Sequence, residues 1–170
     1  MRIRPFVQPD LARLVELTIE TFRPFYEDHF RPLVGDVIFA NQHGAWREDY
    51  RAQVAGLHDP SGHQYVAVAE TDHAIAGYVA WSVDPARRNG AISHLAVAAE
   101  HRRHGTGVAL CEHAFADMRA RGAEVVEIGT GGDPFHAPPG RCTRNWDARR
   151  CRSPTTTGSS DGRVRGLSSP

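Results

Sequence analysis

Two glycines between an apolar segment and a helical pattern are the residues of this chain that most clearly suggest chemistry. Leu95-Ala96-Val97 lies in a run that predicts a strand, and residues 105–121 have the apolar spacing of an amphipathic helix. Gly105 and Gly107 stand at the junction. A helix start presents unpaired backbone N–H groups and a partial positive charge, and glycine lets an anion approach them closely. The order therefore predicts a backbone cradle for a phosphate or diphosphate.

The order Arg-x-x-Gly-x-Gly, read from Arg102 to Gly107, resembles the acyl-CoA diphosphate loop of the GNAT acetyltransferase superfamily. The resemblance covers residues 1–136 in the order of segments as well as in the motif. It implies acetyl-CoA as co-substrate, direct attack of an amine on the acetyl carbonyl, and no covalent enzyme intermediate. It also implies that the backbone of Leu95, Ala96 and Val97 pairs with the pantetheine amides, in a gap where this strand splays from the strand that carries Val126. The diphosphate would be held by N–H groups of Arg103, His104, Gly105, Thr106, Gly107 and Val108, with Arg102 and Arg103 adding charge-assisted contacts.

The rest of the chain predicts the elements that must position this cradle. Apolar runs predict strands at residues 2–7, 65–69, 74–81, 92–98 and 124–128. Apolar residues at helical spacing predict helices at residues 11–22, 46–57 and 105–121. The predicted elements follow one another as helices, then a hairpin that turns at residues 71–73, then strand–helix–strand. This order is typical of a mixed α/β sheet. The resemblance makes that sheet mostly antiparallel and flanked by helices.

Two side-chain patterns give expectations about packing. On the last helix one face should be buried and carries Val108, Cys111, Phe115 and Met118, while the opposite face carries Glu112, Asp117, Arg119 and Arg121. Pro24 is expected to stop or bend the first helix. The large aromatic residues of the early segments could line an acceptor pocket, but a hydrophobic cluster between helices is the commoner arrangement: Phe25, Tyr26, Phe30 and Trp46.

Composition limits the class of protein. A length of 170 residues suits one domain with a real core. No apolar stretch reaches the ~18 residues of a membrane span, and residues 1–5 lack the apolar run of a secretory signal. We therefore expect a cytoplasmic protein with no membrane partner. Cys111, Cys142 and Cys151 have neither zinc-site nor disulfide-framework spacing, so no metal is expected.

Residues 137–170 depart from the family pattern. From residue 136 onward 17 of 35 residues are Gly, Pro, Ser or Thr and no hydrophobic period survives, which predicts an irregular, disordered tail. The family would place one more helix and two closing strands here, so the domain of residues 1–136 is expected to be incomplete. The tyrosine that often protonates the departing thiolate also has no counterpart, because all four tyrosines lie earlier in the chain: Tyr26, Tyr50, Tyr65 and Tyr78.

A frame change near Pro138 or Pro139 would explain this tail, and we state it as a hypothesis. New triplets can be formed from the last base of each codon and the first two bases of the next. In that register Asn145–Trp146 encodes only Leu and Trp146–Asp147 only Gly. The neighbouring triplets permit Arg-Ala-Leu-Tyr-Glu-Lys before this Leu-Gly. The latent segment resembles the missing family helix, tyrosine included.

The sequence assigns no catalytic base. Many family members carry a carboxylate near the strand that matches residues 92–97, where this chain has Ser93 and His94. His94 could titrate near neutrality, but a strand histidine is more often packed or exposed. Asp84 and Glu127 are alternatives, each more typical of a hairpin end or a sheet surface. A water relay to bulk solvent would need none of them.

These observations predict an N-acetyltransferase that passes an acetyl group from acetyl-CoA to a primary amine on a small molecule or protein. Its activity is expected to be impaired if the tail is out of frame, so an inactive acyl-CoA-binding remnant is the alternative. A weaker alternative is nucleic-acid binding through the arginines of the tail. No motif names the acceptor, and a homodimer is allowed without any feature that requires one.

Overall fold

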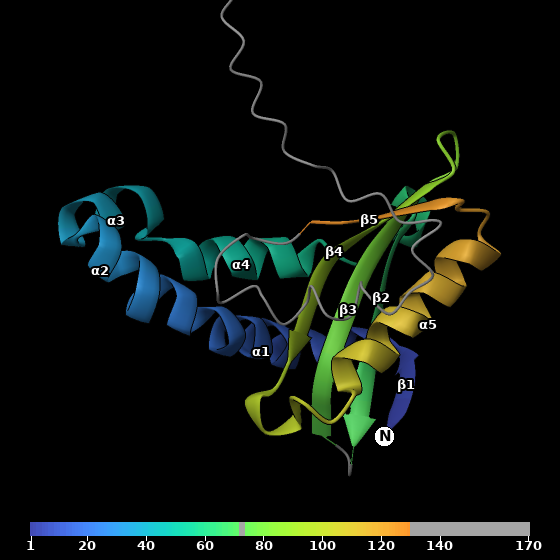
Figure 1. Cartoon of the computed structure of the whole chain (residues 1–170), viewed down its shortest axis with the longest axis horizontal. Helices are drawn as coiled ribbons and strands as arrows, with labels where there is room; N and C mark the ends of the chain where they lie inside the picture. The colour runs from blue at the N-terminus through green and yellow to red at the C-terminus, as the bar shows by residue number, and fades with distance from the viewer. Residues whose placement is uncertain (72–73, 130–170) are drawn as a thin grey trace, which may run out of the picture.

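The computed structural model describes residues 1–71 and 74–129, which form one five-stranded sheet with helices on both faces (Figure 1). The strands are β1 (Arg2–Pro5), β2 (Gln64–Thr71), β3 (Ala74–Asp84), β4 (Asn89–Val97) and β5 (Val125–Ile128). They lie in the order β1-β2-β3-β4-β5; neighbours from β1 to β4 are antiparallel, and β5 runs parallel to β4. The predicted mixed, mostly antiparallel sheet is confirmed.

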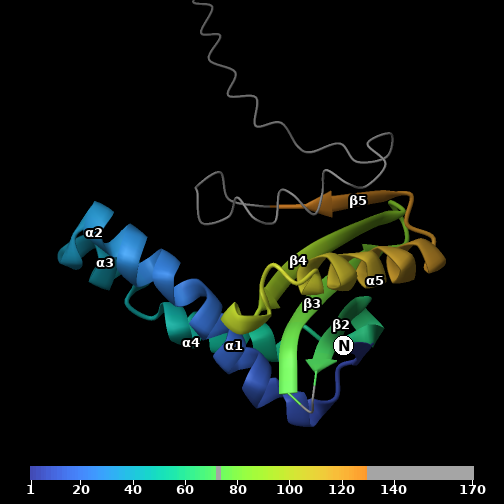
Figure 2. The ribbon, with the colours of Figure 1, turned by 60° about the horizontal axis from the view of Figure 1, so that its bottom comes forward.

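Helices cover the two faces of the sheet unequally (Figure 2). One face is covered by α5 (Thr106–Ala120), and the other by α1 (Leu11–Arg23) and α4 (Trp46–Ala55). Side chains alternate between the faces along each strand, so Val79 and Trp81 of β3 pack on the α5 side while Tyr78 and Ala80 pack on the α1 side. The sheet is therefore buried on both faces over its centre.

Residues 24–43 form an arm that projects from the end of α1 away from the sheet (Figure 1). Helix α1 ends at Arg23, immediately before Pro24, as expected. The chain then continues as a π-helix, η2 (Pro24–Phe30), followed by α2 (Arg31–Val34) and α3 (Asp36–His43). A second break falls at Gly35, whose φ of 82° favours glycine. Three short 3-10 turns, η1 (Gln8–Asp10), η3 (Pro60–Gly62) and η4 (Ala99–His101), complete the described elements.

Aromatic residues pack the arm against α4. Trp46 is only 2% exposed and stacks on Tyr26, with ring centroids 4.7 Å apart. The Arg47 guanidinium lies 4.4 Å from the Trp46 ring centre and forms an ion pair with Glu27. Because both rings are committed to this stack, the geometry favours the hydrophobic cluster over the acceptor pocket for Trp46 and Tyr26.

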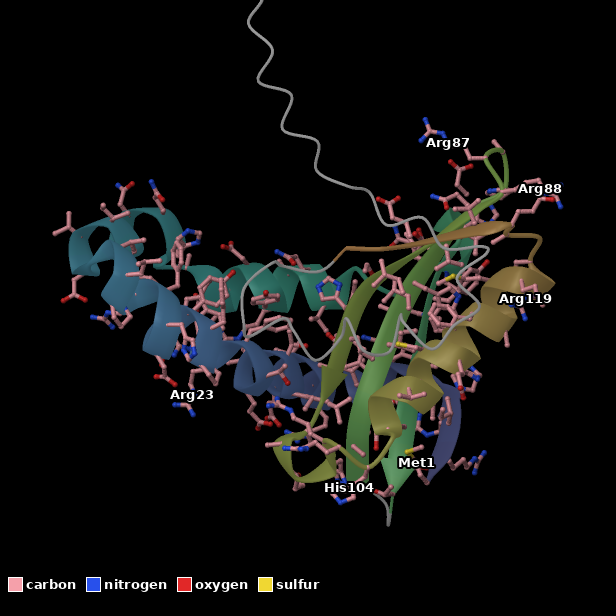
Figure 3. The ribbon with its side chains drawn as sticks, in the orientation of Figure 1. Met1, Arg23, Arg87, Arg88, His104 and Arg119 are labelled. Atoms are coloured by element: carbon pink, nitrogen blue, oxygen red, sulfur yellow. The ribbon has the colours of Figure 1, made fainter. Side chains whose placement is uncertain are left out.

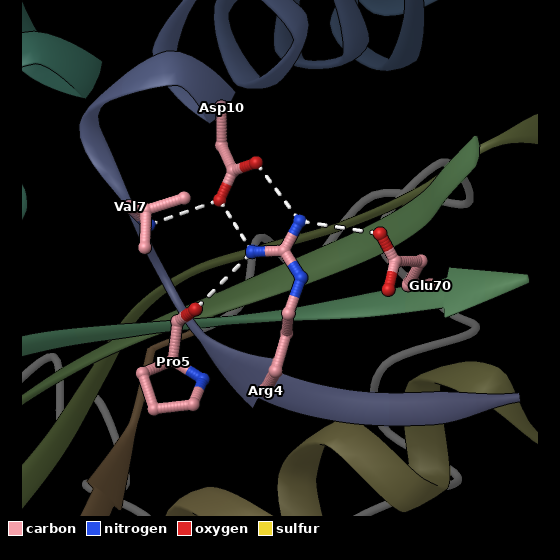
Figure 4. Close-up of polar contacts among 5 residues, drawn as sticks. All are labelled: Arg4, Pro5, Val7, Asp10 and Glu70. Atoms are coloured by element: carbon pink, nitrogen blue, oxygen red, sulfur yellow. Dashed lines mark hydrogen bonds and ion pairs between the residues drawn. The ribbon is translucent and has the colours of Figure 1, made fainter. Parts of the chain in front are cut away.

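Arg4 links the start of the first helical segment to the edge of the sheet through side-chain hydrogen bonds (Figure 4). Its two terminal nitrogens donate to the two carboxylate oxygens of Asp10 at 2.7 and 2.9 Å, and one also reaches Glu70 at 3.4 Å. Asp10 accepts a further hydrogen bond from the Val7 backbone N–H at 3.0 Å. The Arg4 hydrogen bond is the largest cause of a lowered pKa at Asp10. The carboxylate is thus held in its charged form.

The packing of α5 corrects two expectations. Cys111, Phe115 and Met118 are buried as predicted, but Val108 is 43% exposed. Val108 lies on the same helical row as Phe115, but β5 runs beside β4 only over residues 89–92, and at the start of α5 it is the side of Gly107 that faces Val97 of β4. Asp117 does not face away: it accepts hydrogen bonds from Trp81 Nε1 at 2.9 Å and Arg121 Nε at 2.6 Å. The indole N–H of Trp81, on the sheet, thus holds the Asp117 carboxylate toward the sheet.

Several expectations lie outside the described residues. These are the turn at Asp72 and His73, the tail of residues 137–170, and the missing closing helix and strands. Among the helices of residues 1–71 and 74–129, none is long and apolar enough to cross a bilayer.

Candidate functional site

The outer edge of β4 is paired with β5 over only part of its length. The partners are Asn89 to Ile92 on β4 and Val125 to Ile128 on β5. β5 ends at Ile128, the partner of Ile92, and Figure 2 shows β4 continuing past this point at an angle to β5. Within the described residues, the edge from Ser93 to Val97 is therefore left without a strand partner. Such an edge can pair with an extended ligand.

Backbone alternation decides which groups this edge offers. The Ala98 N–H donates to Ala76 O on β3 at 2.8 Å, so Ala96, two residues earlier, also turns its N–H and C=O toward β3. The backbone groups of Leu95 and Val97 point the other way, to the open edge. Of the three residues expected to contact pantetheine, two present free-edge groups and Ala96 does not.

Within residues 1–71 and 74–129, no side chain caps the backbone donors at the start of α5. Gly105 is the N-cap residue, with φ 82° and ψ −2°, and no side chain accepts a hydrogen bond there. The first bond of the helix runs from the Ala109 N–H to Gly105 O at 2.9 Å. The N–H groups of Thr106, Gly107 and Val108 therefore precede the helical ladder and are left for an anion. This arrangement fits a diphosphate.

The loop residues around this cradle are exposed, and one of them already contacts β4. Arg102 Nε donates to Val97 O at 2.9 Å, and Arg102 Nη2 lies 3.5 Å from Thr21 Oγ1 on α1. Arg103 has a left-handed φ of 66°. Figure 3 shows His104 at the end of the sheet opposite Arg87 and Arg88. The structure thus brings the predicted cradle and the open edge together at one end of β4.

A β-bulge at Ser93 interrupts β4 just where β5 leaves it. Trp81 pairs with Ile92 and Ala80 with His94, so Ser93 is the extra residue, and its hydroxyl donates to Ala80 O at 3.3 Å. A bulge shifts the alternation of side chains by one. Ile92 consequently packs on the α5 side, whereas His94 lies on the α1–α4 side beside Tyr50. Nothing in the sequence marks this bulge, and sequence reasoning missed it.

Asp84 and Glu127, the acidic alternatives for a catalytic base, lie at a hairpin end and on the surface of the sheet, as expected for residues with an ordinary structural role. Asp84 is exposed and accepts hydrogen bonds from the backbone N–H groups of Ala86 and Arg87 at 2.9 and 3.0 Å, which closes the β3–β4 turn. Glu127 is exposed on β5. No group of three or more His, Cys, Asp or Glu in the described part of the chain could hold a metal ion.

Comparisons with known proteins agree with this geometry. The model of the Acetyltransferase (GNAT) family matches residues 12–137. No curated protein sequence matches the chain. A protein assigned to the GNAT family from Desulfovibrio desulfuricans superposes with a TM-score of 0.62 and 19% identity, covering 84% of this chain and 81% of that one.

Two further solved structures share the fold. A GNAT acetyltransferase from Brucella melitensis in complex with acetyl-CoA has a TM-score of 0.54 and 20% identity over 82% of this chain and 80% of that one. The aminoglycoside 6'-N-acetyltransferase of Enterococcus faecium has a TM-score of 0.56 and 15% identity over 76% of this chain and 62% of that one. The family match spans well over half of the sequence. The chain therefore belongs to the GNAT acetyltransferase family, a family of acyltransferases whose co-substrate is acetyl-CoA.

Proposed function

We propose that this protein transfers the acetyl group of acetyl-CoA to a primary amine of a small molecule or protein by direct attack. The observation that carries the proposal is the meeting of an open strand edge with an uncapped helix start at one end of β4. Acetyl-CoA supplies an activated acyl group on a thioester. The protein supplies position and backbone dipoles, which are the main sources of rate when no covalent enzyme intermediate forms.

In this proposal the N–H groups of residues 103–108 hold the diphosphate, and the edge groups of Leu95 and Val97 hold the pantetheine arm. Arg102 lies between the two, with its guanidinium on the Val97 carbonyl. From there it can turn to a phosphate and release that carbonyl. A charge-assisted contact to phosphate is stronger than one to a neutral carbonyl, so the exchange favours the loaded state.

Thiol release from acetyl-CoA tests the proposal. The acceptor panel consists of an aminoglycoside, a polyamine, an arylethylamine and an alanine-terminated peptide, with an amine-free reaction as control for hydrolysis. The aminoglycoside and the alanine-terminated peptide are chosen because two proteins of similar fold are named as an aminoglycoside 6'-N-acetyltransferase and a ribosomal-protein-alanine N-acetyltransferase. Amine-dependent release supports the transferase. CoA binding without release on any amine would instead support an inactive acyl-CoA-binding remnant.

We also propose that residues 1–136 are the catalytic domain and that residues 137–170 are an out-of-frame tail, which impairs activity. The forced Leu-Gly reading at residues 145–147 supports the frame change. Sequencing the gene around codons 136–158 tests it directly. A latent family helix in the shifted frame is the expected result, and its absence removes the hypothesis.

A cytoplasmic location, a homodimer and the absence of a nucleic-acid partner stay predictions from the sequence. The arginines that imitate a nucleic-acid tail lie in residues 137–170. Salt-sensitive binding of nucleic acid that is lost on deleting these residues would favour that weaker alternative.

A further inference from the structure

His94 is the side chain that the Ser93 bulge places at the point where β4 and β5 separate. In a regular strand His94, two residues after Ile92, would lie on the same α5 side of the sheet; because Ser93 is a bulge, the imidazole lies on the side of α4. Bulges of this kind re-aim side chains next to functional sites. The residue is half-buried and therefore open to approach from one side.

The position of His94 matches the reactive end of the co-substrate, an argument that rests on the proposed function. The diphosphate cradle lies beyond Val97, so an extended arm must run back along the open edge toward Ser93. Four residues of strand span about 13 Å at roughly 3.3 Å each. The arm thus passes Val97 and Leu95 before its far end reaches the bulge, where His94 is the titratable residue of the strand.

The surroundings of His94 leave its imidazole free to accept a proton. Nδ1 is buried and has no hydrogen-bond partner within residues 1–71 and 74–129. The Tyr50 ring meets the imidazole edge to face at 6.5 Å. Because Nδ1 is buried, the nitrogen that a substrate amine or a bridging water can approach from the exposed side of the residue is Nε2.

No charged group of the described residues opposes this role. The elements packed around His94 present Tyr50 from α4 and Tyr78 from β3, and burial raises the pKa of both phenols, that of Tyr78 to about 12. Glu127 lies on the same face of the neighbouring strand but is exposed to solvent. Burial alone lowers the pKa of His94 from its ordinary 6.5. The ring is therefore neutral, with a free lone pair, at neutral pH.

We propose that His94 is the general base that takes the proton of the attacking amine at Nε2, directly or through one water. As the amine nitrogen bonds to the acetyl carbon, its proton passes to Nε2 and the carbon–sulfur bond breaks. The sulfur leaves with the bonding electron pair as a thiolate. Solvent protonates the thiolate, and the imidazolium returns its proton to solvent. No oxidant, metal or further reactant is needed.

His58 provides a matched control for a test of this role. It too has a buried Nδ1 without a partner among the described residues, and its ring packs on an aromatic ring, Phe6, at 5.2 Å. However, it lies in the loop after α4 and not on β4. H94Q and H58Q thus remove similar imidazoles from similar surroundings, and only one of them borders the open edge.

Thiol-release kinetics on the amine that the full chain turns over form the first arm. H94Q is expected to lower kcat by about 10²-fold or more, with the KM for acetyl-CoA within about twofold. The acid limb of the kcat profile, which in the wild type lies below pH 6.5, should disappear. H58Q should match the wild type. If H94Q fails to fold, H94N takes its place in the test, and the same loss of kcat and of the acid limb is expected from it. Unchanged kcat and acid limb in a folded His94 variant overturn the proposal.

Histidine-labelled NMR of the full chain forms the second arm and needs no turnover. Addition of CoA should shift the His94 ring signals, identified by their loss in H94Q, and leave those of His58 in place. Loss of CoA binding altogether would count against the proposed function. CoA binding that leaves the His94 signals unmoved would overturn the placement of His94 alone.

Discussion

In the proposed diphosphate cradle, Gly105 and Gly107 would have different roles. Gly105 adopts a φ of 82°, which side-chain-bearing residues rarely take. Gly107 has ordinary helical geometry, and a Cβ added there would lie 3.7 Å from Val97 Cγ2, a normal contact. The fold itself does not require glycine at position 107. In the proposed site, a Cβ at position 107 would occupy space between the start of α5 and the Val97 end of the open edge, where the ligand is placed.

The change Gly107→Ala should therefore separate stability from binding. We expect the free energy of unfolding to stay the same or rise by up to about 1 kcal/mol, because alanine is the better helix former. The Kd for CoA should increase about tenfold or more, because a methyl group displaces charge-assisted hydrogen bonds to the diphosphate. Chemical denaturation and calorimetry measure the two quantities. Unaltered CoA affinity would show that the anion lies elsewhere.

Asp10 gives a prediction about stability and pH. Its side chain is 8% exposed and its partner Arg4 20%, so the pair is only weakly screened. Asp10→Asn should cost about 1–3 kcal/mol at pH 7. Because the folded pKa of Asp10 lies below the ordinary 3.8, this contribution is complete above pH 3.8 and is lost as the pH falls through the lower folded value.

Urea unfolding at pH 7 and pH 2 checks this prediction, since the gap between wild type and Asp10→Asn should shrink at pH 2. Glu124 is the control: it pairs with Arg88 at 2.8 Å, but both side chains are more than half exposed. Glu124→Gln should change stability by less than about 1 kcal/mol. Equal costs for the two variants would contradict the account of Arg4 and Asp10.

At the scale of elements, α5 lies so close to the sheet that β4 needs glycine at one position. A Cβ added to Gly90 would come within 2.5 Å of Met118 Sδ and 3.0 Å of its Cγ. Met118 is fully buried and has no room to swing aside. The contact fixes how near the helix axis can approach β4.

Gly90→Ala should accordingly destabilise the protein by about 1–3 kcal/mol through overpacking, measured as a lower melting temperature. Gly129→Ala is the matched surface change, because no atom of the described residues lies within 4 Å of a Cβ built there. We expect almost no shift from it. Similar melting temperatures for the two variants would mean that α5 packs less tightly than described.

The sequence predicted most elements, and its errors have local causes. Hydrophobic periodicity identified the described strands and α1, α4 and α5 to within a few residues, because their faces are buried against one another. The end of the first helix at Pro24 was predicted, but the π-helix that follows was not, since a π-helix leaves no pattern of its own. Val108 was misplaced because helical spacing alone does not say which side of each turn faces the sheet.

The candidate site was predictable in part for the same reason. The glycine motif marks the cradle, because a left-handed residue before a helix needs glycine at position 105. The bulge at Ser93 depends on pairing between β3 and β4, which no local pattern encodes. The contact of Arg102 with Val97 is likewise tertiary.

At the scale of the whole molecule, β5 is the least covered strand of the described sheet. Among the described residues β5 pairs with β4 alone, over four positions, and its Val125 is 48% exposed. An uncovered edge strand with apolar side chains favours aggregation. If residues 137–170 are out of frame, the closing strands that would cover this edge are lost.

Expression of this chain beside a frame-restored version tests that consequence. The restored protein should be more soluble and melt at a higher temperature, because added strands pair the edge and bury its apolar groups. Size-exclusion chromatography and thermal denaturation provide the comparison. Equal solubility and equal melting temperature would refute the proposed role of the missing strands.

Calorimetric titration of CoA into Gly105→Ala and Gly122→Ala tests the central claim most directly. Both glycines have a positive φ, 82° and 90°, and they lie at opposite ends of α5. In the described part of the chain, no atom lies within 4 Å of a Cβ added to either. Each change should cost about 1–2 kcal/mol of stability. We predict that Gly122→Ala binds CoA like the wild type and that Gly105→Ala binds it much more weakly. Equal affinities, or no heat from the wild type with CoA or acetyl-CoA, would contradict the claim that the start of α5 holds the diphosphate.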